Sequence, residues 1–273
     1  MQTRNDPAHC LFARAQACLA LCDPAAKLAA TAQAAAAFAA GALRVDADAA
    51  APHDIAAPGR PQLPRLVAPR DLPRRGLGTS AGRVALIHAV AHIEFNAINL
   101  AWDAVYRFRS MPAAYYCDWV RVAADEARHF ALLQTRLREL GHEYGDFDAH
   151  DGLWEMAVKT AESCLARMAL VPRVLEARGL DVTPGMIARL RAVGDADSVT
   201  ILETILREEV VHVAAGSRWF GYCCACAGRD PESTFAELIA QYARASLKGP
   251  FNTAARLAAG FSAAELARLE TAA

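Results

Sequence analysis

The chain has no large excess of charge of either sign and few aromatic residues. Its 273 residues include 29 Lys and Arg and 30 Asp and Glu, so its net charge is −1. This balance argues against a protein whose main role is to coat nucleic acid or an anionic membrane. Aromatic residues make up 7% of the chain; Val, Ile and Thr dominate no long run, whereas Ala, Leu, Arg and Glu do. The composition therefore favours helix over sheet and predicts an all-α fold.

The start of the sequence lacks the pattern of a secretory signal. Asp6, Pro7 and Arg14 interrupt the basic flank and the apolar run that such a signal needs. We therefore expect a cytoplasmic protein whose eight cysteines are reduced thiols and not a disulfide framework. Three of the cysteines, Cys223, Cys224 and Cys226, lie close together near the end of a predicted helix. A helix lacks the turn of a zinc knuckle, so we expect these cysteines to be buried thiols.

Only one segment is apolar enough to raise the question of a membrane span. Residues 84–102 contain a single formal charge, that of Glu94. An ionised group at the bilayer centre costs roughly 2.5–3.5 kcal/mol on insertion scales, so we expect this helix inside the protein and no membrane partner. A carboxylate in so apolar a helix needs a partner of its own.

The rest of the chain divides by composition into four parts. Residues 1–50 are predicted as an N-terminal helical segment packed on the core, restarted at Pro24 and ended at Gly41. Residues 51–79 contain six prolines and five arginines and predict an extended arm, solvated and paired with surface carboxylates. The alternative is an arm that contacts phosphate or an anionic substrate. Residues 80–228 are predicted as a four-helix bundle, and residues 229–273 as C-terminal helices.

Turn and cap residues set the expected helix boundaries within the bundle. The four long helices are predicted at 80–109, 112–141, 152–179 and from Asp195 or Asp197 to 228. A short helix is expected to open at Thr183 and to break at Gly194. Pro172 should kink the third helix, either to open space for a substrate or only to bend the helix around its core. Two shorter helices are expected at 231–248 and 262–269.

Two stretches of the predicted bundle share a pattern of acids and histidine. Residues 125–129 read Asp-Glu-Ala-Arg-His, and residues 208–212 read Glu-Glu-Val-Val-His. In each, a Glu and a His three residues later lie about 60° apart around a helix and about 4.5 Å apart along it, so both reach one metal ion. Carboxylate oxygen and imidazole nitrogen together suit iron, manganese or zinc better than calcium or magnesium.

A lone glutamate precedes each Glu-x-x-His pair at nearly the same distance. Glu94 lies 32 residues before Glu126, and Glu176 lies 33 residues before Glu209. This repeat of a two-helix unit would supply four carboxylates and two imidazoles to two metals about 3.5–4 Å apart. The alternatives are solvated helix faces and a buried polar network without metal, and Glu155 and Glu162 are rivals of Glu176. The predicted ligands are Glu94, Glu126, His129, Glu176, Glu209 and His212.

Other polar residues beside these ligands are expected to support them or to bond elsewhere. Asp125 and Glu208 are expected to accept the second ring N–H of a metal-bound histidine on a neighbouring helix, with Arg128 bracing such a carboxylate. His88 and His92 lie about 120° and 160° from Glu94 around the helix, so we expect them to bond elsewhere.

The order Glu, Glu-x-x-His, Glu, Glu-x-x-His resembles that of the ferritin-like di-iron carboxylate superfamily. Residues 125–129 resemble the D/E-E-x-R-H form of oxygen-activating members, such as bacterial multicomponent monooxygenases and MiaE-type tRNA hydroxylases, although Val211 departs from it in the second stretch. A closer resemblance is to the bacterial family DUF455. It rests on Leu-Pro-Arg-Arg-Gly-Leu-Gly at 72–78, His-Ile-Glu at 92–94, Val-Leu-Glu-Ala-Arg-Gly-Leu-Asp at 174–181 and Leu-Lys-Gly-Pro-Phe-Asn at 247–252.

These resemblances imply a ferritin-like four-helix bundle with extra N- and C-terminal helices, favour Glu176 over Glu162, and supply no substrate. The expected function is that of a non-haem di-iron oxidoreductase, a hydroxylase or oxygenase, with two Fe ions (or Mn, or mixed Fe/Mn). It would use O2 or peroxide, a small-molecule substrate and a separate electron donor, because no flavin or nicotinamide fingerprint is apparent. The alternatives are a ferroxidase, a peroxidase, a manganese catalase or a non-catalytic scaffold. A nucleic-acid substrate is not expected.

Overall fold

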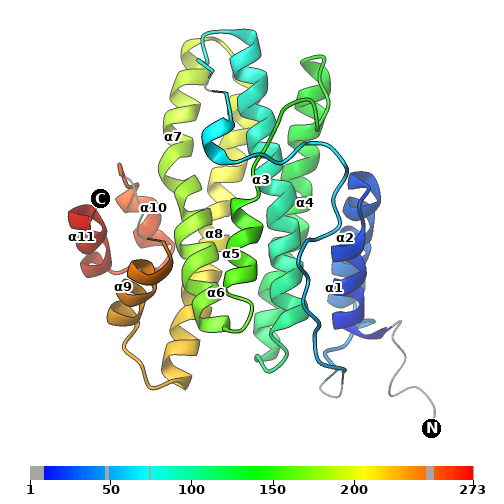
Figure 1. Cartoon of the computed structure of the whole chain (residues 1–273), viewed down its shortest axis with the longest axis vertical. Coiled ribbons are helices and arrows are strands. Elements are labelled where there is room, and N and C mark those ends of the chain that lie inside the picture. Colours follow the sequence, from blue (N-terminus) through cyan, green and yellow to red (C-terminus); the bar gives the residue numbers. More distant parts are fainter. Residues whose placement is uncertain (1–8, 47–48, 74, 244–248, 273) are drawn as a thin grey trace. The chain divides into compact units, whose positions relative to one another are not determined.

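The computed structural model describes residues 9–46, 49–73, 75–243 and 249–272. In these ranges the regular structure is helical and contains no strand, so the predicted all-α class is confirmed (Figure 1). The chain forms two compact units, residues 1–158 and residues 159–273. The first unit contains α1 (Leu11–Ala20), α2 (Pro24–Ala39), α3 (Ser80–Arg107) and α4 (Ala113–Glu139), and α5 (Gly152–Lys159) lies at its end.

The long helices α3 and α4 form the centre of the first unit. They pack along each other, while α1 contacts α3 and α2 contacts α4 (Figure 1). Both predicted segments are confirmed to within two residues at each end, and the side chain of Thr79 caps α3 by accepting from the Gly82 amide. One 18-residue window of α3 has the length and composition of a membrane span, and 78% of it is buried. This burial fits a helix in the core of a folded protein.

The described part of the arm has no α-helix, as its prolines predict, and only the short 3-10 turn η2 (Pro69–Asp71). Arg65 donates to both carboxylate oxygens of Asp148, at 3.1 and 2.6 Å. The expectation of an arm that pairs with surface carboxylates is therefore confirmed at Arg65. Arg74 lies outside the described residues.

The second unit follows a different course from the one the sequence predicts. It contains α6 (Cys164–Leu170), the π-helical turn η3 (Val171–Glu176), α7 (Ala177–Ala192), α8 (Ala196–Cys226), α9 (Pro231–Tyr242), α10 (Thr253–Ala258) and α11 (Ala263–Ala272). The prediction of one continuous helix over residues 152–179 is wrong in two respects. The helix is interrupted after α5, where the side chain of Ser163 caps α6, and it does not end at Gly179.

Helix α7 runs through Pro184, where the sequence predicts a new helix. Pro184 has no amide hydrogen and leaves the carbonyl of Leu180 without its helical donor. The side chain of Asn252 donates to that carbonyl at 3.1 Å. The helix therefore continues because a residue 72 positions away supplies the missing hydrogen bond.

The remaining boundaries of the second unit agree with the sequence more closely. Asp195 caps α8 as predicted, since its side chain accepts from the Ser198 amide. Pro172 distorts the helix as predicted, in the form of the π-helical turn η3. The predicted helix 231–248 is described only to Tyr242, because residues 244–248 lie outside the described residues. The prediction of buried thiols holds for Cys224 but not for half-buried Cys223 or exposed Cys226, because the last turn of α8 presents these two positions toward solvent.

Candidate metal centre

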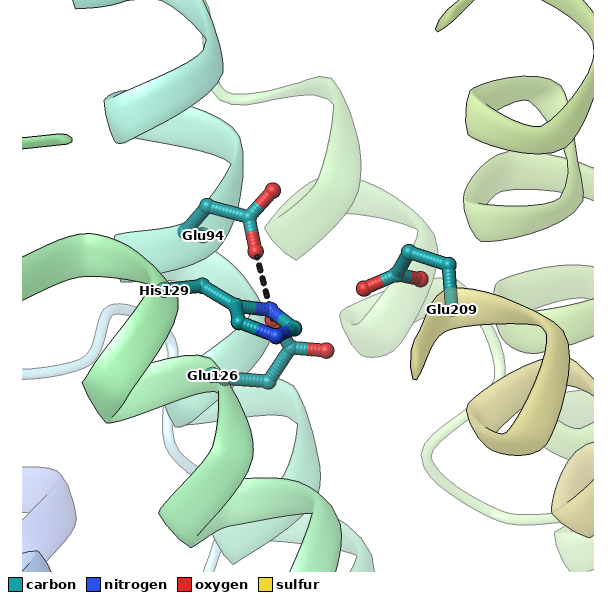
Figure 2. Close-up of side chains that lie close together, drawn as sticks. All are labelled: Glu94, Glu126, His129 and Glu209. Atoms are coloured by element: carbon teal, nitrogen blue, oxygen red, sulfur yellow. Dashed lines mark hydrogen bonds and ion pairs between the residues drawn. The ribbon is translucent and has the colours of Figure 1, made fainter. Parts of the chain in front are cut away.

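Helices α3 and α4 bring three of the predicted ligands together inside the first unit. One ligand atom each of Glu94, Glu126 and His129 lies within 4.8 Å of the others. Nδ1 of His129 is 3.1 Å from Oε2 of Glu94 and 3.4 Å from Oε2 of Glu126. Figure 2 shows the two carboxylates and the imidazole ring turned toward one another. The i, i+3 spacing on α4 places Glu126 beside His129, and the packing of α3 on α4 adds Glu94.

All three side chains are buried, with 4%, 1% and 0% of the surface of Glu94, Glu126 and His129 exposed. Burial by itself lowers the pKa of His129. Hydrogen bonds to Glu126 and Glu94, together with their negative charges, outweigh that effect and raise the pKa of His129 to about 11. The two nearby carboxylates therefore favour the protonated form of His129.

The donor chemistry of this group fits a transition metal. Two carboxylates and one imidazole, all on rigid helices and all shielded from water, match the ligands that iron, manganese and zinc take in proteins. Binding a metal would require His129 to lose its proton, so binding would release a proton. Glu94, Glu126 and His129 would hold the ion.

The second unit carries the other three predicted ligands. On α8, Nδ1 of His212 lies 3.3 Å from Oε1 of Glu209, and both residues are buried. Glu209 is also drawn in Figure 2. Glu176 ends the π-helical turn η3 and is 8% exposed. The second unit therefore has a buried carboxylate–imidazole pair and a second buried carboxylate, all of the predicted types.

The rival glutamates lie in different surroundings. Glu155 on α5 is exposed, and so is Glu162 in the turn that follows α5. Burial thus separates Glu176 from both rivals, although metal binding by Glu176 stays a prediction.

The acidic residues that precede the Glu-x-x-His pairs are partly exposed to solvent. Nη2 of Arg128 donates to Oδ1 of Asp125 at 2.7 Å, which is the bracing contact that the sequence predicts. Glu208 lies 3.8 Å from the guanidinium of Arg207. A role for Asp125 or Glu208 in orienting a metal-bound histidine stays a prediction.

His88 and His92 bond away from the glutamates, as expected. The backbone amide of Gly145 donates to Nε2 of His88 at 2.9 Å, and Nδ1 of His92 lies 2.9 Å from the Tyr144 hydroxyl. Burial lowers the pKa of each of these histidines to about 4.

The sequence patterns do not reveal one buried charged residue near a predicted ligand. Arg173 lies three residues before Glu176, and its guanidinium pairs with Glu265. Ser262 and Glu265 have the spacing of a capping box, which predicts a helix start but gives no sign of the distant arginine.

The chain matches the family described as "Protein of unknown function (DUF455)" over residues 20–267. A Haemophilus influenzae protein described as "Uncharacterized protein" is 47% identical over 213 residues, which cover 76% of this chain and 74% of that protein. No solved structure matches the chain. The matched family region includes all six predicted ligands, and the chain belongs to the DUF455 family.

Proposed function

We propose that the chain is a non-haem di-iron oxidoreductase with a ferritin-like bundle, in which two Fe ions, or Mn, are held by six side chains. The observation that carries the proposal is the buried group of Glu94, Glu126 and His129. The same residue types recur in the second unit at nearly the same sequence spacing. Bound metals would supply the redox chemistry that activates O2 or peroxide toward a small-molecule substrate, with electrons from a separate donor.

The charge of the six ligands supports two divalent ions. Four carboxylates carry four negative charges, and two divalent cations with two neutral imidazoles balance them. A buried group of charges is stable only when its members compensate one another. A cluster of this composition would be neutral inside the protein, whereas one ion would leave an uncompensated negative charge.

The chain's own residues would have distinct tasks. Glu94 would supply a carboxylate from α3, and Glu126 and His129 would supply a carboxylate and an imidazole from one face of α4. The apolar neighbours of Glu94 on α3, among them Phe95 and Ile98, are buried and exclude water from its surroundings. His129 would bind in its neutral form and release its proton on binding.

One observation favours a second candidate function, that of a helical scaffold with a metal-free polar network. His129 lies close enough to both carboxylates to bond with each of them. A protonated His129 would therefore compensate one of these two buried negative charges without any metal.

Metal content separates the two candidates. The purified chain is loaded with iron(II) without oxygen, dialysed and analysed for metal by elemental analysis. We expect about two iron ions per chain. The variants Glu126→Gln, His129→Asn and Glu176→Gln should each retain less iron than the wild type. Glu155→Gln and Glu162→Gln are matched controls that should keep both ions. A wild-type chain that retains no transition metal would refute the proposal and favour the scaffold.

The reaction class needs a second measurement. Reduced, iron-loaded protein is mixed with O2 or with hydrogen peroxide, and consumption of each is followed over time. We expect consumption of O2 that stops after one turnover unless an electron donor is added. Rapid disproportionation of peroxide by the manganese-loaded chain would identify a catalase instead.

A further inference from the structure

The π-helical turn that carries Glu176 is tied to the C-terminal segment by Arg173. This side chain is 2% exposed. Its Nη2 donates to both carboxylate oxygens of Glu265 on α11, at 2.8 and 2.9 Å, and its Nε donates to Oγ of Ser217 on α8 at 3.1 Å. One guanidinium therefore joins η3, α8 and α11.

Three aromatic rings surround this ion pair. The guanidinium carbon of Arg173 lies 4.8, 4.2 and 4.4 Å from the ring centroids of Phe220, Phe235 and Phe261. Aromatic faces attract a cation but cannot neutralise it. Loss of the Glu265 charge would leave a buried cation without its counter-ion, which is strongly unfavourable.

Glu265 is itself held in place by the first turn of α11. Its backbone amide donates to Oγ of Ser262 at 3.0 Å, and the Ser262 amide donates to Oε2 of Glu265 at 2.8 Å. This reciprocal arrangement is a capping box. The carboxylate that faces Arg173 therefore has a fixed position at the start of a helix.

A second buried ion pair offers a natural comparison. Arg256 of the C-terminal segment donates to both carboxylate oxygens of Asp181 on α7, at 2.9 and 2.7 Å. It also lies over Phe261, with its guanidinium carbon 4.9 Å from the ring centroid. The two pairs share an aromatic ring and a chain segment, but only the Arg173 pair includes a residue of η3.

We infer that Arg173 is a positioning residue for Glu176, held in place by Glu265. The inference rests on the proposed function. In the π-helical turn the backbone departs from the regular hydrogen bonding of an α-helix, and contacts with other elements help to fix its position. Arg173 supplies such contacts three residues before Glu176. The carboxylate of Glu176 is then correctly placed for metal only while Arg173 keeps its pairing with Glu265.

The test compares Glu265→Gln with Asp181→Asn in the full-length chain. Glutamine keeps the capping box but removes the charge that faces Arg173, whereas Asp181→Asn removes the equivalent charge from the other pair. Cobalt(II) titration, followed by visible absorption, gives the metal affinity. Hydrogen exchange of the metal-free protein gives the protection of residues 171–176.

We expect Glu265→Gln to weaken binding of one of the two cobalt ions about 10–100-fold and to raise exchange over residues 171–176. Asp181→Asn should do neither, and Glu265→Asp, which keeps the charge, should recover part of the affinity. Wild-type-like cobalt binding by Glu265→Gln would overturn the inference, whether or not exchange rises, and so would an equal loss in Asp181→Asn. A wild-type chain that binds no cobalt would instead refute the proposed function, and the inference with it.

Discussion

Three buried histidines of the first unit differ in the direction of their pKa shifts because their neighbours differ. His88 accepts from a backbone amide and His92 bonds to a tyrosine hydroxyl, and burial, the largest effect on both, lowers the pKa of each to about 4. His129 lies between two carboxylates, which raise its pKa to about 11 against the effect of burial. The Glu-x-x-His spacing predicts the contact with Glu126, because helix geometry alone fixes it. Gly145, the partner of His88, and Tyr144, one partner of His92, lie more than 50 residues away, and no local pattern reveals them.

The metal-free protein should lose stability as the pH falls from 6.5 toward 4. In this window the unfolded chain protonates His88 and His92, whereas the folded chain does not, so the free energy of unfolding falls by up to about 1.4 kcal/mol per pH unit for each histidine. The raised pKa of His129 acts in the opposite direction, because the unfolded chain takes up this proton as the pH falls through 6.5, and it offsets a small part of the loss. Urea unfolding at pH 7 and pH 5 measures the effect. A His88→Asn/His92→Gln double variant should lose less stability between the two pH values, and an equal loss would contradict the assignment.

At the scale of the elements, the sequence predicts regular helices better than it predicts their distortions. The boundaries of α3 and α4 follow from cap residues and composition within each segment. The course of α7 through Pro184 depends on Asn252, which is remote in sequence, and the form of η3 depends on α8. Gly216 on α8 leaves room for the ring of Pro172 in η3, a match that neither segment reveals alone.

Substitution of Gly216 should therefore lower the stability of the folded chain, although alanine has the higher helix propensity. A Cβ atom at Gly216 would lie 2.4 Å from both Cβ and Cγ of Pro172, whose ring cannot rotate away. We expect Gly216→Ala to lower the free energy of unfolding by about 1–3 kcal/mol. In the same helix, Gly221 has open space around it, and Gly221→Ala should raise stability by about 0.5–1 kcal/mol. Thermal unfolding measures the change in stability of each variant relative to the wild type. Equal changes for Gly216→Ala and Gly221→Ala would contradict close packing of Pro172 against Gly216.

At the scale of the whole molecule, the sequence repeat matters more than any single motif. It predicts two sets of one glutamate and one Glu-x-x-His pair, and each compact unit contains one such set with all three side chains buried. The repeat cannot predict how the two sets combine, because spacing along a chain carries no information on packing between helices far apart. The ferritin-like bundle and the dinuclear centre are therefore proposals that rest on the ligand pattern.

The proposed centre predicts that metal stabilises both units together. Manganese(II) loading should slow hydrogen exchange in α4 of the first unit and in α8 of the second, because bound metal stabilises only the folded state. Glu94→Gln, a change in α3, should reduce the protection of α8 as well as that of α4. Glu162→Gln serves as the control and should leave both unchanged. Protection confined to one unit would contradict a centre that uses ligands from both.

The most direct measurement is a crystal structure of the iron-loaded chain with anomalous scattering recorded at the iron absorption edge. The account predicts two anomalous peaks about 3.5–4 Å apart, bound by Glu94, Glu126 and His129 from one unit and by Glu176, Glu209 and His212 from the other. A map without iron at these side chains, or with a single ion bound by one unit alone, would contradict it.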